Sequence, residues 1–482
     1  MSPRNEGLLD QGQWDPNPKQ DVLHTANAAA KWTMELLRPS ILTRPGIRQK
    51  IRPTAYLDGL RGWSAFMVYW HHHQLFPRQL ANPIFESGWG SEGRYYFVAL
   101  PGVRNFFTGG HFAVAVFFII SGYVLSAKPL SLIYAGDHQK LGDNLASALF
   151  RRWLRLHLPV AAVSFIYVTC WHLFGIYTLA PDHKDTWAEE VWNWYIEFKN
   201  FSFVFRTGGE AWLTSQYHTW SIPVEFRGSI IIYTALLAFS RATRNARLWC
   251  ELGLVYYFMY IVDGWFGAFF MAGLILCELD ILAKMNDLPI FITKFKPYTT
   301  PIVYTMFITS IYLSGVPSFS RDKEVLRASP GWYYLSFLAP QAVFDLKWFY
   351  LFWAAIFLVA SIPHLPWLRS FFESSFCQYL GRISFALYLM HGPVLWTLGD
   401  RLYQATGWYR EEHVIFTPGW VNIFPLSQKG PLGLELSFLA PHLILLPVTL
   451  WAAEVVTRVF DEPSVRFSQW AYSKVLPERP EL

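Results

Sequence analysis

Hydrophobic residues in this chain gather in long blocks separated by polar stretches, and they do not alternate with polar residues. Ten blocks reach the roughly 17 residues that a membrane-spanning helix needs. They cover residues 61–77, 107–127, 156–178, 218–240, 246–262, 264–283, 298–315, 345–365, 377–398 and 433–457. The pattern predicts an all-α fold, a polytopic membrane helix bundle of about ten transmembrane helices.

The blocks also set the expected domain boundaries. The transmembrane domain is predicted over residues 56–460. The fifth and sixth blocks meet at Asp263-Gly264, and they could instead form one re-entrant hairpin. Residues 1–55 are polar and lack the apolar run of a signal peptide, so we expect an uncleaved cytosolic N-terminal segment. A short cytosolic tail is predicted over residues 461–482.

Basic residues between the blocks predict the orientation. If ten helices alternate, one side receives Arg48, Lys50, Arg52, Arg151, Arg152, Arg155, Arg241, Arg244, Arg247, Lys284, Lys294, Lys296, Arg369, Arg458, Arg466 and Lys474. Lys and Arg favour cytoplasmic loops, so both termini are expected in the cytosol. Arg321, Lys323 and Arg327 are the main exception.

Composition agrees with a membrane protein. The chain is 53% hydrophobic and 16% charged, whereas soluble domains carry about 25% charged residues. A net charge of +5 fits a topology signal better than nucleic-acid binding. The four cysteines lie in or beside apolar blocks without ligand spacing, so they predict core thiols and no metal site.

Candidate chemistry begins in the first block. Arg61 and His72 are eleven residues apart, close to three helical turns, so they should share one face about 16 Å apart. Such polar residues are costly inside a membrane and indicate function. His72 is the candidate general base, because imidazole titrates near neutral pH. Its alternative is an interfacial histidine, a role that suits His71 and His73 well, and the sequence leaves open which of the three faces the site.

Three further segments carry candidates. Arg152 and Arg155 are three residues apart and could bind the phosphates of a nucleotide-bearing donor, although topology charge is the simpler interpretation. Glu225 lies in an apolar block without a basic residue at i+4, and a hydrogen bond that orients His72 is geometrically possible. Ser121-Gly122 suits either close helix packing or a backbone opened to a ligand.

The ninth block repeats the order of the first, because Arg382 is followed nine residues later by His391. His391 precedes Gly-Pro, so it has the alternative role of satisfying a carbonyl freed by the proline.

With these segments in order, the chain resembles the acyltransferase 3 family of integral-membrane acyltransferases, in particular its fungal-type members. The resemblance rests on Leu57-Asp58-Gly59-Leu60-Arg61-Gly62 with His72, Phe117-Phe118-Ile119-Ile120-Ser121-Gly122-Tyr123, Arg151-Arg152-Trp153-Leu154-Arg155, Trp220-Ser221-Ile222-Pro223-Val224-Glu225, and Leu380-Gly381-Arg382-Ile383-Ser384 through His391. The three adjacent histidines and Ile222-Pro223 depart from the usual family pattern.

The resemblance implies transfer of an acyl group, most often acetyl, from acyl-CoA to a hydroxyl of a small natural product, sugar or lipid. By the same resemblance His72 is the base and Glu225 supports it. The residues expected on the donor side are Arg61, Ser121, Tyr123, Arg151, Arg152 and Arg155. No permanently bound cofactor is implied, acetyl-CoA is the expected co-substrate, and an endomembrane such as the endoplasmic reticulum is the expected location.

Two other classes of function are compatible with polar residues inside a membrane. A proton-coupled transporter would use His72 and Glu225 as a relay, but the chain lacks the duplicated halves that many transporters show. A membrane di-iron oxygenase would use His71-His72-His73. Such enzymes need several histidine boxes, and His111, His218, His391 and His442 are isolated in the sequence.

Overall fold

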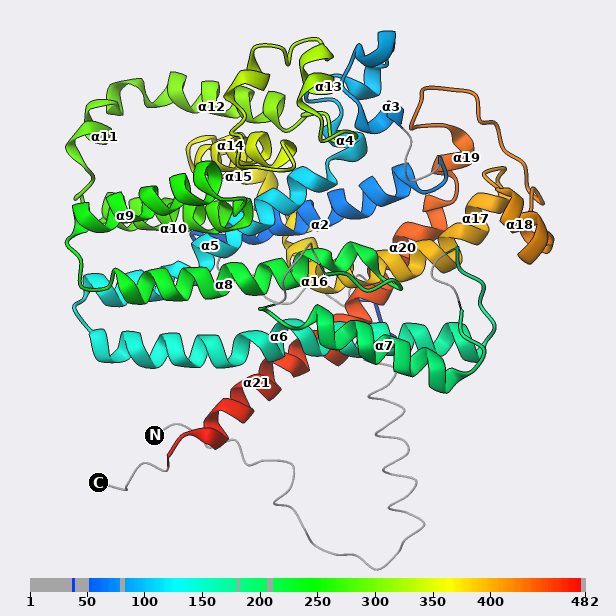
Figure 1. Cartoon of the computed structure of the whole chain (residues 1–482), viewed down its shortest axis with the longest axis horizontal. Helices are drawn as coiled ribbons and strands as arrows, with labels where there is room; N and C mark the ends of the chain where they lie inside the picture. Colours follow the sequence, from blue (N-terminus) through cyan, green and yellow to red (C-terminus); the bar gives the residue numbers. More distant parts are fainter. Residues whose placement is uncertain (1–36, 40–51, 79–82, 180–182, 206–210, 478–482) are drawn as a thin grey trace, which may run out of the picture. The chain divides into compact units, whose positions relative to one another are not determined.

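The computed structural model describes residues 37–39, 52–78, 83–179, 183–205 and 211–477 (Figure 1). Within these ranges the protein is helical, and an isolated bridge between Leu213 and Gln216 is the one strand-like pairing. The all-α prediction is therefore confirmed. The chain divides into residues 1–48 and the unit 49–482. Most of the predicted polar segment 1–55 lies outside the described residues.

Twelve long helices build the unit: α2 (Ala55–Leu75), α5 (Gly110–Tyr134), α6 (His138–Leu173), α7 (Trp187–Phe201), α8 (Ser221–Ala238), α9 (Arg244–Tyr256), α10 (Trp265–Lys284), α12 (Thr299–Leu313), α14 (Lys347–Ser361), α16 (Ser375–Val394), α20 (His442–Val456) and α21 (Glu462–Val475), among the described residues. Shorter helices connect them: α3 (Pro83–Glu86), α4 (Asn105–Thr108), α11 (Ile290–Lys294), α13 (Lys323–Ala328), α15 (Pro366–Phe372), α17 (Asp400–Ala405), α18 (Glu411–Phe416) and α19 (Leu436–Leu439). Turns of other helix types extend the long helices in the described residues: η4 (Tyr217–Trp220), η5 (Tyr257–Ile261), η6 (Lys296–Tyr298), η8 (Ile362–His364), η9 (Leu395–Gly399) and η11 (Thr457–Asp461).

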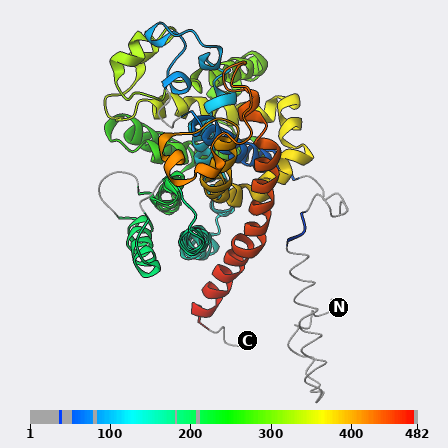
Figure 2. The same ribbon diagram turned by 90° about the vertical axis from the view of Figure 1, so that its right-hand side faces the viewer.

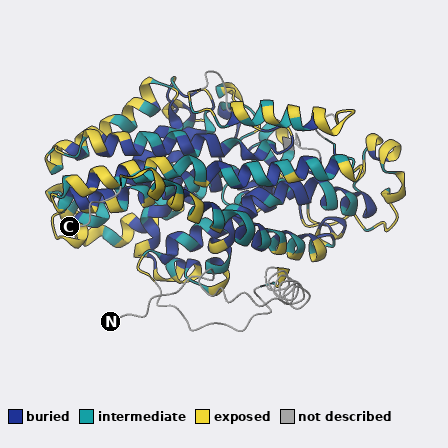
Figure 3. Cartoon of the chain, turned by 90° about the horizontal axis from the view of Figure 1, so that it is seen from below, coloured by how far each residue is buried: buried dark blue, intermediate teal, exposed yellow. Residues whose placement is uncertain are grey.

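Six helical runs in the described part are long and apolar enough to cross a bilayer: Gly110–Tyr134, His138–Leu173, Tyr217–Ala238, Trp265–Lys284, Lys347–His364 and Leu436–Val475. Buried residues fill the interior of the bundle, and exposed residues lie on its outer faces (Figure 3). The outer faces carry large apolar side chains such as Leu443 and Trp249, which are 81% and 73% exposed. An apolar exterior of this kind suits contact with lipid.

The start of α6 differs from the prediction. The third apolar block begins at residue 156, but α6 begins at His138, where the Asp137 side chain accepts a hydrogen bond from the backbone N–H of Lys140. Its 36 residues span about 54 Å, more than the roughly 30 Å hydrocarbon core. The Arg151–Arg155 cluster, expected at the entry to a helix, therefore lies in the middle of α6, because hydropathy marks the membrane-embedded part and not the helix ends.

The C-terminal end differs in the same way. The last apolar block ends at residue 457, but helix continues through α20, η11 and α21 to Val475. These elements form one long, nearly continuous helical segment (Figure 2), and its η11 and α21 parts pack against α6. Arg458 and Arg466 are therefore helical residues and not part of an extended tail.

Helices α2 and α16 pack closely side by side in the middle of the bundle (Figure 1). A Cβ added to Gly62 would stand 2.2 Å from the backbone nitrogen of Gly381, and one added to Gly381 would stand 2.5 Å from the carbonyl oxygen of Asp58. Small residues permit this close backbone approach. Residues 61 and 72 of α2 meet residues 384 and 391 of α16, so the two helices run parallel.

We expect Gly62→Ala to destabilise the protein, because its methyl group has no room between the two backbones. Overpacking a filled core costs about 1–3 kcal/mol, and here neither neighbour is a flexible side chain. Gly253→Ala in α9 is the matched control, since a Cβ there meets nothing within 4 Å. Thermal unfolding in detergent checks the prediction. Equal melting temperatures for the two variants would contradict it.

The Ser121-Gly122 pair serves two separate purposes. A Cβ on Gly122 would stand 2.1 Å from the carbonyl oxygen of Phe270, so this glycine brings α5 against α10. Ser121, on a neighbouring face of α5, instead lines an internal cavity. The close-packing interpretation therefore holds for Gly122.

Candidate active site

A cavity of about 320 Å³ lies between α2, α5, α6, α8, α16 and η11. Its charged wall consists of four arginines and two carboxylates: Arg61, Arg152, Arg155, Arg382, Glu225 and Asp461. Hydroxyl groups on the wall come from Ser121, Ser221, Ser384 and Tyr388. Apolar side chains of α5, including Phe117 and Phe118, complete it. The excess of guanidinium groups suits an anionic ligand, and the apolar side suits an uncharged chain.

Arg61 ties α2 to α16 at the charged wall. Its Nε donates to Ser384 Oγ at 3.1 Å, and one terminal nitrogen donates to the carbonyl of Gly381 at 3.2 Å. The same guanidinium lies 3.3 Å from the Asp58 carboxylate. Its side chain remains 37% exposed, so it is held at the cavity with a surface left for a ligand.

Glu225 is placed differently from the sequence expectation. Its carboxylate forms an ion pair with Arg152, whose Nε also donates to Ser229 Oγ at 2.7 Å. Both members of the pair are largely buried, with side chains 11% and 15% exposed. His72 bonds elsewhere, so the expected hydrogen bond between it and Glu225 is not formed. The sequence contained no i+4 partner because the partner comes from another helix.

The remaining donor-side candidates divide into two groups. Arg155 and Ser121 line the cavity, as predicted for donor contact. Arg151 and Tyr123 do not. Arg151 Nε donates to the carbonyl of Ser147 within its own helix, and the Tyr123 hydroxyl donates to Asp280 at 2.7 Å. Consecutive helical residues are rotated by about 100°, which separates Arg151 from the cavity face of Arg152.

At the end of the cavity away from Arg61, two hydroxyl groups form a hydrogen-bonded pair. The oxygens of Ser221 and Tyr388 lie 2.7 Å apart, and the Tyr388 hydroxyl also donates to the backbone carbonyl of His218. The ring of Tyr388 lies 5.5 Å from that of His218 and 5.8 Å from that of His391. The cavity therefore ends against a group of histidines.

His72 belongs to this histidine group and faces inward. Its ring centroid lies 5.0 Å from His391 and 6.2 Å from His218, and it does not line the cavity itself. Its Nδ1 lies 2.9 Å from the carbonyl of Val68. If Nδ1 carries the proton and donates to that carbonyl, Nε2 is left as the proton acceptor. The backbone of α2 thus supplies the orientation that was expected from Glu225.

His218 and His391 are members of the group that sequence reasoning left unassigned. Both ring nitrogens of His218 and the Nε2 of His391 are buried without a hydrogen-bond partner in the described part of the chain. Buried polar atoms of this kind usually bind a ligand or water. His391 Nδ1 faces the carbonyl of Leu387, not the Leu389 carbonyl that Pro393 would free. The shared order of arginine and histidine in α2 and α16 was the available signal.

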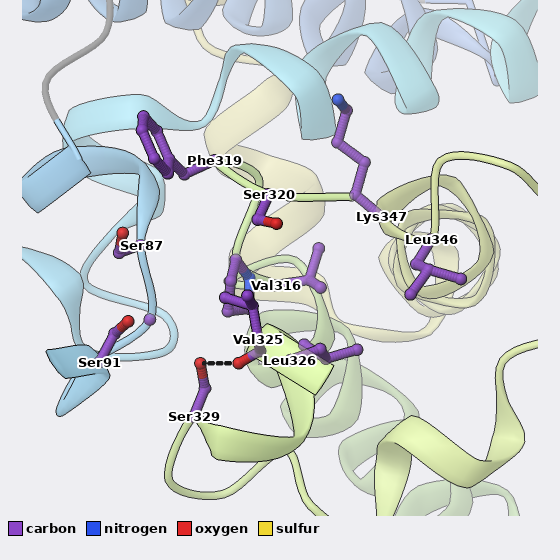
Figure 4. A pocket seen from close by; sticks show the side chains of 12 residues that line it. Ser87, Ser91, Val316, Phe319, Ser320, Val325, Leu326, Ser329, Leu346 and Lys347 are labelled. Carbon is purple, nitrogen blue, oxygen red and sulfur yellow. Dashed lines mark hydrogen bonds between the residues drawn. The ribbon is translucent and has the colours of Figure 1, made fainter. Parts of the chain in front are cut away.

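A second pocket is too small to compete with this cavity. It holds about 10 Å³ and lies between Ser87, Ser91 and the residues 316–329, with Lys347 at one side (Figure 4). The Ser329 hydroxyl on its wall donates to the carbonyl of Val325. A space of this size holds about one water molecule.

Comparison with known proteins agrees with the motif pattern. A family model described as acyltransferase domain (Acyl_transf_3) matches residues 54–428. O-acetyltransferase PaAT-1 of Phomopsis amygdali is 30% identical over 470 residues, covering 92% of this chain and 89% of the relative. Acyltransferase R4 of a Phoma strain is 24% identical over 73% of this chain and 84% of its own length. Acyltransferase clz18 of Cochliobolus lunatus is 22% identical over 75% and 86%. No solved structure matches the chain significantly.

Proposed function

Because this chain belongs to the acyltransferase 3 family and is an acyltransferase, we propose that it is a membrane-bound O-acyltransferase that moves an acyl group from acyl-CoA directly to a hydroxyl of a small natural product. The relative from Phomopsis amygdali, which is named an O-acetyltransferase, supports acetyl as the acyl group. Family membership favours this enzyme over the transporter with a His72–Glu225 relay.

One observation carries the proposal: an arginine-lined cavity ends beside an inward-facing imidazole. Helices α2 and α16 each place an arginine at the cavity and a histidine beyond its inner end. Arg61 and His72 are about 16 Å apart by helix rise, a length that a phosphopantetheine arm can bridge. We assign the phosphates to the arginine wall and the thioester to the end near Tyr388.

In the proposed reaction His72 Nε2 removes the proton of the acceptor hydroxyl as the oxygen attacks the thioester carbonyl. A new C–O bond forms, and the C–S bond to CoA breaks. The thiolate then takes the proton from the imidazolium and leaves as free CoA. No covalent acyl-enzyme is required, and holding donor and acceptor together in an orientation fit for attack supplies much of the acceleration.

Glu225 receives a different role in this proposal from the one that the resemblance implied. Its carboxylate neutralises and positions Arg152, and Ser229 fixes the same guanidinium from the adjacent turn of α8. Glu225 is therefore a positioning residue on the donor side and not a partner of His72.

The proposed topology keeps ten spans with both termini in the cytosol. Four shorter elements complete the ten alongside the six apolar runs: α2, α9 with η5, α12, and α16 with η9. The arginines of the cavity then face the cytosol, where acyl-CoA is available, and an endomembrane such as the endoplasmic reticulum is the proposed location.

Acyl transfer by the purified protein in detergent micelles tests the proposal. With labelled acetyl-CoA and a metabolite extract from a fungal culture, we expect label in a hydroxyl-bearing product and release of free CoA. Micelles hold no ion gradient, so transport cannot account for the product. Boiled protein is the control. The proposal would be contradicted if no labelled product formed and free CoA appeared no faster than with boiled protein.

A further inference from the structure

Three metal-ligand side chains from separate elements converge beside the histidine group. They are His71 of α2, Glu86 of α3 and His111 of α5, and their ligand atoms all lie within 4.8 Å of one another. His71 Nδ1, Glu86 Oε1 and His111 Nδ1 are each buried, and in the described residues each lacks a hydrogen-bond partner. Three buried polar atoms without hydrogen-bond partners are costly, and their closeness to one another indicates a shared ligand.

From this arrangement we propose that His71, Glu86 and His111 bind one divalent transition-metal ion of the Zn²⁺ class. Two imidazoles and one carboxylate are ligands that such ions prefer, and three protein ligands leave one position for water. Bonds of about 2.0–2.2 Å place tetrahedral ligand atoms roughly 3.3–3.6 Å apart. The Nδ1 of His111 lies 4.0 Å from Glu86 Oε1, so this pair would close by about 0.4–0.7 Å on binding a metal, and a pair at the 4.8 Å limit of the group would close by about 1.2–1.5 Å.

The surroundings leave these atoms available. Arg104 forms an ion pair with Glu86, at 3.8 Å from its Oε1 and so beyond hydrogen-bond distance. Its guanidinium instead donates to the carbonyls of Phe85, Gly315 and Val316 and to the hydroxyl of Ser318. Burial lowers the pKa of Arg104, and Glu86 opposes this effect. The other nearby cation, Lys347, is paired with Asp345 at 2.6 Å.

Two features hold the ligands in place. A Cβ on Gly110 would stand 2.6 Å from the ring carbon Cγ of His71, so glycine at this position makes room for the imidazole. The carbonyl of Glu86 accepts hydrogen bonds from the backbone N–H groups of Ser318 and Phe319. A metal here would fasten α2, α3 and α5 together next to His72, whose ring is 5.1 Å from that of His71.

The sequence predicted no metal site because the ligands are far apart along the chain. Glu86 follows His71 by 15 residues, and His111 follows Glu86 by 25. This spacing matches no short metal-binding motif, so only packing brings the three together.

Metal content of the purified full-length protein tests the site without using its activity. We expect about one zinc per chain by elemental mass spectrometry, loss of that zinc in Glu86→Gln and in His111→Gln, and retention in His364→Gln, which removes an exposed histidine elsewhere. Iron in place of zinc with the same pattern among the variants would support a site of the same class.

Thermal unfolding provides a second readout. Added Zn²⁺ is expected to raise the melting temperature of metal-stripped wild type and of His364→Gln, but not of Glu86→Gln, whose isosteric side chain preserves packing. Co²⁺ substitution should give the visible absorption of a tetrahedral ion in the wild type but not in Glu86→Gln or His111→Gln. Wild-type protein that binds no metal after incubation with Zn²⁺, or variants that bind as much as wild type, would overturn the proposal.

Discussion

Replacing His72 with alanine is expected to lower acyl transfer by about 10²- to 10⁴-fold, the usual contribution of a positioned general base. In the proposed reaction this imidazole takes the proton of the acceptor hydroxyl. Its ring faces inward beside His218 and His391, with Nδ1 next to the Val68 carbonyl. Initial rates with labelled acetyl-CoA measure the effect. Binding of CoA by the variant should stay within about twofold of wild type, because the arginine wall is untouched.

The matched control is His364→Ala, which removes an exposed histidine that does not line the cavity. It is expected to retain wild-type transfer and melting temperature. Equal activity of His72→Ala and wild type, at equal amounts of folded protein, would remove the base assignment. A joint loss of transfer and CoA binding would instead place residue 72 on the donor side.

Arg152→Ala is expected to raise the KM for acyl-CoA roughly 10- to 100-fold, because a hydrogen bond to a charged group contributes about 1.5–3 kcal/mol. The same substitution leaves the Glu225 carboxylate largely buried without its guanidinium partner. Breaking a buried ion pair from one side costs about 3–5 kcal/mol. Steady-state kinetics and thermal unfolding therefore both respond, and the two effects must be separated.

The double variant Arg152→Ala/Glu225→Ala, compared with Arg152→Ala alone, separates the effect on donor binding from the effect on stability. Removing both partners should restore much of the stability, since no unpaired charge is left, while the high KM persists. Arg151→Ala is the matched control, because Arg151 faces away from the cavity and bonds within its own helix. A normal KM in both Arg152 variants would exclude Arg152 from donor binding, and a rise in KM for Arg151→Ala would contradict the assigned cavity face.

The presence of helices was predictable from the local composition of each segment. Each apolar block became helix, because an apolar stretch of about 20 residues has no better way to satisfy its backbone in lipid. Helix ends were less predictable. The polar first half of α6 and the continuation from α20 into α21 are helical without being apolar, so a hydropathy pattern could not mark where they stop.

The candidate site was predictable where its members share one helix. Arg61 and His72 lie three turns apart on α2, and helical periodicity alone places them on one face. The partner of Glu225 was not predictable, because the guanidinium of Arg152 reaches it from a different helix. The distinction between Arg151 and Arg152 also depended on which face of α6 turns toward the cavity.

By itself, then, the sequence determined the helical membrane architecture, the family and the arginine and histidine of α2, because these follow from properties of single segments. Only the tertiary structure decided that His218 and His391 join His72, that Glu225 pairs with Arg152, and that His71, Glu86 and His111 converge. The physical reason is that contacts between helices depend on close approach at positions such as Gly62 and Gly110, and spacing along one segment does not encode which helix packs there.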